Sequence, residues 1–195
     1  MERPYHHGDL RARVLAIAAE VVAESGVDAL SLRELARRAG VSHAAPAHHF
    51  GNRRGLVTAL ATEGFHLLAA TLEPSVAAGE FDRTAVAYVR FALSHPGHYG
   101  VMFRSDLLAT TDDALADARR RTTALLDSGL ASVPGDRLLV GPTQARQCAW
   151  ALVHGLATLW LGGALPGTDP ERLTLAAAHQ LFGDATAGTE AGRAQ

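Results

Sequence analysis

The stretch SLRELARRAGVSHAAPAHHFGNRRGL, residues 31–56, decides the fold of this chain. It opens with Ser31 three residues before Glu34, the capping box in which a hydroxyl and a carboxylate each accept a hydrogen bond from an unpaired N–H at a helix start. That short helix ends at Gly40, whose backbone freedom permits a tight turn, and Ser42 can cap a second short helix. Two short helices joined by a tight turn predict a helix-turn-helix.

The second of these helices has the features of a DNA-reading helix. In a helix-turn-helix, the first residues of the second helix meet the base edges of the major groove. Here they are His43, Ala44 and Ala45, and the small alanines permit close approach and contact with thymine methyl groups. Pro46 falls at the edge of what a first helical turn tolerates, which predicts a short or bent helix.

Positive charge gathers next to this helix. Asn52 can cap a further helix, and Arg53 and Arg54 lie at its start, where backbone amides and guanidinium groups together can hold a phosphate. Residues 1–55 carry eight Arg and six acidic residues, a net charge of plus two, whereas the whole chain has a net charge of −2. This end of the chain is therefore the expected face for an anion.

Apolar residues with helical spacing flank the motif on both sides. Leu10, Val14, Ile17 and Val21 share one face of a helix that stops at residues 25–26, where a glycine takes the usual capping position. After the motif, a helix continues as far as Pro74, with its apolar stripe made of Leu56, Leu60 and Leu67.

Beyond residue 73 the sequence predicts longer helices separated by helix-breaking residues. The breakers are Pro74 and the segments 95–97, 132–135, 141–142 and 166–167, and four or five helices fit between them. The sequence lacks the alternation of apolar and polar residues that indicates a strand, so the predicted class is all-α. We expect a three-helix helix-turn-helix domain at residues 8–68, a helical bundle for ligand binding and dimerisation at 75–184, and a disordered tail at 185–195.

Composition excludes several classes of protein. A chain of 195 residues that is 48% hydrophobic and 19% charged is neither disordered nor fibrous. Its one cysteine, Cys148, cannot form an internal disulfide, and the amino terminus lacks the apolar core of a secretion signal. The uncharged run at 148–165 reaches the length of a membrane span, but His154, Thr158 and the following Pro166 favour a buried helix. We expect a cytoplasmic protein that does not enter the membrane.

In its helix-turn-helix segment the chain resembles the TetR family of transcriptional regulators. Residues 32–42, followed by 48–53 and Leu56, carry the resemblance, which covers residues 9 to about 67. The resemblance implies that the helix after the turn reads DNA and that Phe50 packs its end. The predicted DNA-binding residues are Ser31, Ser42, His43, Ala44, Ala45, His48, His49, Arg53 and Arg54.

Two departures from the family pattern concern DNA binding. Ala47 stands where the family usually has a tyrosine, so the expected contact between a hydroxyl and a phosphate is missing. Arg54 and Gly55 stand where the family usually has an acidic pair. Affinity would then depend more on Arg53, Arg54 and His48.

The rest of the chain resembles a subset of that family whose ligand domain contains Trp followed by His-Gly. Residues 42–46, 95–99 with 102–103, and 150–155 carry this resemblance. It implies a homodimer through helices at about 144–161 and 171–182, and an effector pocket in the carboxy-terminal bundle. The candidate pocket residues are Tyr88, Phe91, Tyr99, Met102, Phe103, Trp150 and His154, and the candidate dimer residues are Trp150, Leu159, Trp160, Leu175 and His179.

The function that follows is a ligand-responsive homodimeric repressor that binds a near-palindromic operator and is released by a small apolar effector. Two alternatives stay open: an architectural DNA-binding protein without effector control, and a small helical enzyme. No nucleophile stands beside a base and no paired carboxylates indicate a cleft, so we expect no catalytic residue and no cofactor. Adjacent histidines on a helix point about 100° apart, so His48 and His49 cannot share a metal ion, and we expect no metal site.

Overall fold

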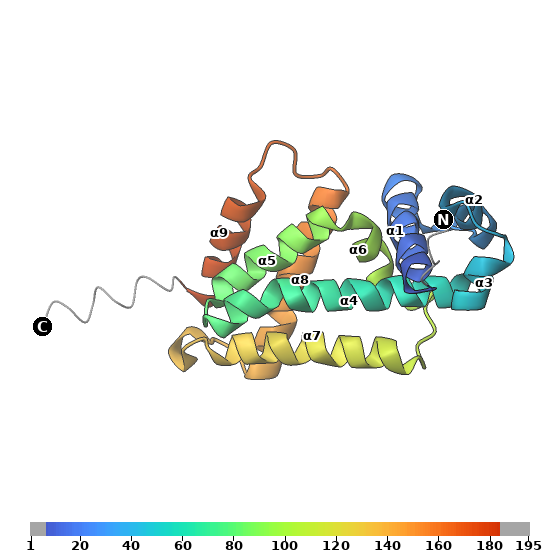
Figure 1. Cartoon of the computed structure of the whole chain (residues 1–195). Helices are drawn as coiled ribbons and strands as arrows, with labels where there is room; N and C mark the ends of the chain where they lie inside the picture. The colour runs from blue at the N-terminus through green and yellow to red at the C-terminus, as the bar shows by residue number, and fades with distance from the viewer. Residues whose placement is uncertain (1–6, 184–195) are drawn as a thin grey trace, which may run out of the picture. The chain divides into compact units, whose positions relative to one another are not determined.

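The computed structural model describes residues 7–183, and this part of the chain is all-α, as the sequence predicts (Figure 1). Its α-helices are α1 (His7–Ser25), α2 (Leu32–Ala39), α3 (Ala44–Phe50), α4 (Arg53–Ala77), α5 (Phe81–Ser94), α6 (Pro96–Met102), α7 (Asp113–Ala131), α8 (Pro142–Leu161) and α9 (Pro170–Phe182). Two short 3₁₀ helices, η1 (Val27–Ala29) and η2 (Gly135–Arg137), accompany them. The tail expected at 185–195 lies outside the described residues.

These residues form two compact units. Unit 1 combines the chain up to His66 with His95–Arg120, and unit 2 combines Leu67–Ser94 with the chain from Arg121 onward. Helices α4 and α7 each contribute to both units, because each runs across a boundary between them. Unit 1 contains α1, α2, α3 and α6, whereas unit 2 contains α5, α8 and α9.

The helix ends of unit 1 follow the signals in the sequence. The Ser31 hydroxyl accepts a hydrogen bond of 3.1 Å from the Glu34 N–H and so caps α2. Gly40 ends α2 in the left-handed region with φ 66°, which glycine adopts without steric cost. The Asn52 side-chain oxygen accepts a hydrogen bond of 3.0 Å from the Gly55 N–H at the start of α4. The predicted starts of α2 and α4 are therefore confirmed.

The start of α3 differs from the prediction. Ala44 is its first residue, and its capping position is occupied by His43, with no side-chain hydrogen bond to the backbone. A capping side chain usually belongs to a residue with extended backbone, but His43 already has helical angles, φ −60° and ψ −26°. The Ser42 carbonyl instead accepts a hydrogen bond of 3.1 Å from the Ala45 N–H. The expected Ser42 hydroxyl cap is wrong.

Helix α4 continues past the proline at which the sequence predicted its end. It reaches Ala77, three residues beyond Pro74. Proline removes one helical hydrogen bond, but the carbonyls that follow it remain satisfied by the turn after the helix. The Pro74 carbonyl accepts from the Ala78 N–H at 3.1 Å, and the Ser75 carbonyl accepts from the Glu80 N–H at 2.9 Å.

Helix α4 is also the one helix among the described residues that is long and apolar enough to cross a membrane. Within the protein, 56% of its most apolar stretch is buried. Partial burial of this kind is typical of the core helix of a globular protein, because an apolar helix needs cover from its neighbours.

Helix α6 turns back onto α1 and helps to form the core of unit 1. A Cβ atom on Gly97 would lie 2.0 Å from the Ala19 carbonyl oxygen, so only glycine permits this close approach. The Tyr99 ring lies 5.5 Å from the Phe103 ring, which lies 5.7 Å from the Phe65 ring of α4. The aromatic side chains around α6 thus pack within unit 1.

Helix α5 is the centre of unit 2, where it packs against α8 and α9 (Figure 1). Its side chains Tyr88 and Phe91 are each only 1% exposed. On its outer side, Arg83 and Arg90 donate hydrogen bonds of 2.9 and 3.0 Å to the Glu171 carboxylate in the first turn of α9. Apolar burial and these ion pairs together fix α9 along α5.

Candidate nucleic-acid interface and effector cavity

The exposed face of α3 carries the predicted reading residues. Ala44 and His48 are exposed and His43, at the capping position, is exposed beside them. On the opposite face, Pro46 and Phe50 are buried and hold α3 to the rest of unit 1. The short helix therefore has one anchored face and one open face of small and imidazole side chains, as a helix that enters a groove requires.

Phe50 anchors the end of α3 as the resemblance implies. Its ring is 8% exposed, and the Arg11 guanidinium of α1 lies over it, 5.6 Å from the ring centre. This cation–π contact adds to apolar burial in fixing α3 against α1. Ala45 and His49 are half-buried, so these two predicted contact residues are less accessible than His48.

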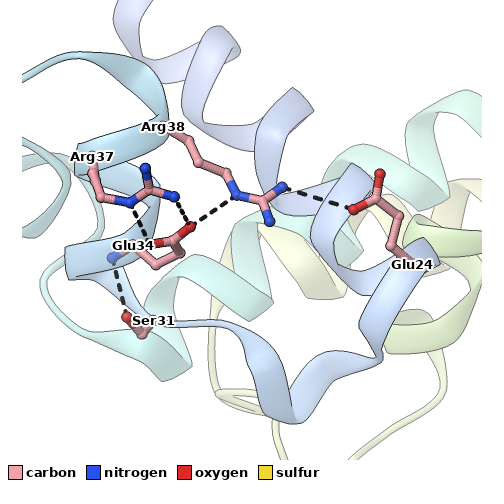
Figure 2. Close-up of polar contacts among 5 residues, drawn as sticks. All are labelled: Glu24, Ser31, Glu34, Arg37 and Arg38. Carbon is pink, nitrogen blue, oxygen red and sulfur yellow. Dashed lines mark hydrogen bonds and ion pairs between the residues drawn. The ribbon is translucent and has the colours of Figure 1, made fainter.

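A charged network covers α2, and the sequence prediction missed it (Figure 2). The Glu34 carboxylate accepts hydrogen bonds from Arg37 at 2.6 and 2.8 Å and from Arg38 at 3.0 Å. Arg38 also lies 3.8 Å from the Glu24 carboxylate of α1. The spacings i,i+3 and i,i+4 on one helix are the signal from which these pairs could have been found.

This network corrects half of the predicted capping box. Glu34 does not reach back to the backbone at Ser31, because charge-assisted hydrogen bonds to two guanidinium groups hold its carboxylate on the outer face of α2. The same hydrogen bonds, first from Arg37 and then from Arg38, lower the pKa of Glu34 to about 2. The carboxylate is therefore charged at neutral pH and orients both arginines.

Both arginines at the start of α4 make hydrogen bonds inside unit 1. The Arg53 guanidinium donates to the carbonyls of Val27 and Leu30 at 2.7 and 3.1 Å. Arg54 donates to the carbonyls of Asp106 and Leu108 at 3.3 and 3.2 Å. A guanidinium has five N–H donors, so each side chain keeps donors for a phosphate while it holds a neighbouring loop. Their predicted role as phosphate anchors stays a prediction.

No metal cluster is present among the described residues: no three His, Cys, Asp or Glu side chains converge there. The His95 and His98 rings, three positions apart in the sequence, lie 5.9 Å apart. The buried His98 instead has its Nε2 atom 3.0 Å from the Glu63 carboxylate of α4. This pair satisfies a buried imidazole.

A narrow apolar cavity lies in unit 2, lined by side chains of α5, α7, α8 and α9. Its volume is about 30 Å³, room for about one water molecule. Phe81, Tyr88, Trp150 and Phe182 supply its aromatic walls, and Arg146 is its one charged wall residue. Sequence analysis missed Phe81, Phe182 and Arg146, which come together only when α5, α8 and α9 pack.

The predicted pocket residues separate into two groups. Tyr88 and Trp150 line the cavity, and the Tyr88 hydroxyl lies 3.3 Å from the His154 Nδ1 atom. The Trp150 and His154 rings are 5.2 Å apart. Burial lowers the pKa of His154, so its imidazole is neutral at pH 7.

The remaining pocket candidates are placed elsewhere. Tyr99, Met102 and Phe103 belong to unit 1, because α6 packs against α1, so the structure does not bring them to the cavity. Phe91 is buried in α5 but does not line the cavity. The Pro96-Gly97 break that redirects α6 is visible in the sequence. Which helix α6 then packs against depends on the tertiary structure.

The candidate dimer residues lie on α8 and α9. Trp150 and Leu159 are large apolar side chains that are 43% and 47% exposed. Trp160 is half-buried, and its indole Nε1 atom is buried without a hydrogen-bond partner among the described residues. Leu175 and His179 are half-buried on α9. Further exposed apolar residues that the sequence analysis missed are Leu139, Val140 and Leu161.

Comparison with known proteins agrees with this architecture. Residues 14–60 match the family model described as bacterial regulatory proteins of the tetR family, and residues 81–181 match the tetracyclin repressor-like C-terminal domain. No protein among the curated ones matches the sequence.

Solved structures are similar over nearly the whole chain. A protein of unknown function from Rhodococcus sp. RHA1 is 36% identical, with a TM-score of 0.78 over 93% of this chain and 97% of that one. The TetR family transcriptional regulator PfmR from Thermus thermophilus is 20% identical, with a TM-score of 0.69 over 88% and 95%. AibR, solved in complex with isovaleryl coenzyme A and operator DNA, is 16% identical, with a TM-score of 0.67 over 89% and 98%.

The two family models together cover most of the chain, and the more amino-terminal of them contains the helix-turn-helix built from α2 and α3. The chain belongs to the TetR family of bacterial transcriptional regulators.

Proposed function

We propose that this DNA-binding regulator acts as a homodimeric, ligand-responsive repressor on a near-palindromic operator. The observation that carries the DNA-reading part is the exposed face of α3, where His43, Ala44 and His48 are open to a groove while Pro46 and Phe50 anchor the helix. Two such helices in one dimer would enter successive major grooves about 34 Å apart.

Homodimerisation is supported by the surface of α8. Trp150, Leu159 and Leu161 are each at least 40% exposed, on a helix that carries no acidic residue. Large apolar side chains that are exposed on a helix favour burial against a second copy of the chain. In a dimer with a two-fold axis, the same helix of the partner would cover them. The half-buried Trp160, Leu175 and His179 would lie at or near that interface.

Effector control is supported by the apolar cavity of unit 2. Its aromatic walls suit a small apolar molecule, but its volume of about 30 Å³ is far below the roughly 300 Å³ of typical ligand pockets. The effector would therefore bind a more open form of unit 2 and would act through its differential affinity for the two forms. AibR offers a precedent for a similar fold with a ligand and DNA.

The experiment is a titration of the purified protein against its own upstream intergenic DNA and a scrambled duplex at two salt concentrations, read by fluorescence anisotropy. We expect tighter binding to the upstream fragment, with a stoichiometry of dimers. Equal, salt-sensitive binding to both fragments would place the operator elsewhere. No binding to either duplex would contradict the proposal.

The two alternatives predict different results. An architectural protein would bind DNA without release by any small molecule, and its DNA affinity would be insensitive to ligands of unit 2. We expect no enzymatic activity, because acidic side chains such as Glu34, Asp169 and Glu171 are engaged in helix caps and ion pairs and no nucleophile is paired with a base in the sequence. Ligand-induced release of DNA would argue for a regulator over both alternatives.

A further inference from the structure

A second cavity in unit 2 has a different chemical character from the apolar one. Its volume is about 350 Å³, within the usual range of small-molecule sites. Phe81, Val133 and Leu175 supply apolar walls, and Asp82, Arg137 and His179 supply polar ones. These residues come from the first turn of α5, the segment around η2, and α9.

Asp82 is the distinctive group of this cavity. Its side chain is only 12% exposed, and no group among residues 7–183 donates a hydrogen bond to its carboxylate within normal geometry. Arg137 and His179 lie within ion-pairing range, at 3.7 and 3.3 Å. A largely buried carboxylate normally accepts hydrogen bonds, so Asp82 has unused acceptor capacity at the wall of the cavity.

Arg137 is held beside that carboxylate rather than on it, because two of its N–H groups bind the end of α9. It donates hydrogen bonds to the carbonyls of Phe182 and Gly183 and so closes the end of α9. It remains near enough to Asp82 to balance the carboxylate charge. The neighbouring Arg83 is paired with Glu171.

This balance of charge selects the ligand chemistry. An anionic head group would meet the Asp82 carboxylate, and a cationic one would meet the Arg137 guanidinium. An uncharged hydroxyl can donate to Asp82 without either repulsion. We propose that this cavity binds a small alcohol with an apolar body, whose hydroxyl donates to Asp82 while the body packs against Phe81, Val133 and Leu175.

Phe81 connects this cavity with the apolar cavity, because its side chain lines both. Its ring packs edge-on against Phe182, with ring centres 5.3 Å apart. An alcohol whose body displaces the Phe81 ring would enlarge the apolar cavity from this side. This regulatory consequence rests on the proposed effector control, whereas binding of the alcohol does not.

The test compares three probes of equal size by isothermal titration calorimetry on the full chain at pH 7: 4-phenyl-1-butanol, 4-phenylbutanoate and 4-phenylbutylammonium. The alcohol is expected to bind most tightly. In Asp82→Asn its affinity should fall about tenfold, as expected when a charge-assisted hydrogen bond becomes a neutral one, and the carboxylate probe should gain. Asp136→Asn, an exposed position on η2 with the same change of charge, should leave all three affinities unchanged.

Equal affinity of the wild-type chain for the alcohol and the carboxylate would overturn the proposal, and so would an unchanged ratio of the two in Asp82→Asn. If the Asp82→Asn variant does not fold, the comparison of the alcohol with the carboxylate on the wild-type chain decides by itself. The alcohol is then added to the protein bound to DNA. If the alcohol binds in the calorimeter but does not release DNA, effector control is contradicted and the alcohol site is still supported.

Discussion

At the scale of single residues, Arg53 combines a structural contact inside unit 1 with an exposed guanidinium. Arg53 joins the start of α4 to the carbonyls of Val27 and Leu30, and it is still 41% exposed. Such a side chain can hold the scaffold with some of its donors and offer the others to a phosphate. Its structural and DNA-binding contributions should therefore be separable by measurement.

Arg53→Ala should show both contributions. We expect the free energy of unfolding to fall by about 1–3 kcal/mol, because two partly buried carbonyls lose charged donors. We also expect weaker binding to all DNA sequences and a salt dependence reduced by about one unit. Urea denaturation and anisotropy at several salt concentrations measure the two effects, with Arg33→Ala on the exposed face of α2 as the control for stability. An unchanged salt slope would leave Arg53 with its structural role alone.

Glu34 offers a prediction about pH. Its pKa in the folded chain is about 2, below the ordinary value of 4.5, so the network with Arg37 and Arg38 stabilises the fold above pH 4.5 and is lost as the pH falls toward 2. A titration of the Glu34 side-chain carbon by NMR at low salt should give a midpoint far below 4.5. High salt should raise that midpoint, because the pair is on the surface. A midpoint near 4.5 at low salt would show that the network does not form.

His154 should make the stability of the protein sensitive to mild acid. Burial lowers its pKa from the ordinary 6.5, so the unfolded chain takes up a proton before the folded chain does, and stability falls as the pH drops below 6.5. His154→Gln keeps a polar partner for Tyr88 but does not titrate. Unfolding by urea at pH 7.5 and 5.5 should show a smaller loss for the variant than for the wild type. Equal losses would mean that other groups cause the acid sensitivity.

At the scale of helices, the sequence predicted local features better than tertiary ones. Ser31, Gly40 and Asn52 fixed the ends of α2 and the start of α4, because caps depend on residues within one turn. The partner of Glu34 and the extension of α4 beyond Pro74 were mispredicted, since each depends on competing contacts. The cavity walls Phe81 and Phe182 could not be paired from the sequence, because they are 101 positions apart and meet only through helix packing.

The exposed apolar side chain of Leu159 on α8 makes a prediction at this scale. Leu159→Asp should place a charge in the proposed dimer interface and yield a monomer of unchanged helix content, because an unpaired charge at an apolar interface is costly. Analytical ultracentrifugation and circular dichroism measure the two properties. Ala124→Asp, on an exposed position of α7, serves as the control and should leave the dimer intact. A Leu159→Asp protein that remains dimeric would place the interface elsewhere.

At the scale of the whole molecule, the DNA-binding motif and the cavities belong to different units. The helix-turn-helix lies in unit 1, and both cavities described above lie in unit 2. α4 is one continuous helix with residues in each unit, and in the proposed mechanism ligand binding would act on the helix-turn-helix through it. Regulation by a ligand would be a coupling free energy between these units.

The central claim is that the open face of α3 reads the operator, and the most direct measurement is the sequence preference of His43→Ala. Binding of wild type and variant to a randomised operator library, at fixed salt, gives the preference at each base pair. We predict a changed preference at one position of each half-site, with binding to unrelated DNA unchanged, and no change for the control Thr143→Ala on α8. A uniform loss of affinity with the same preference at every position would contradict the claim.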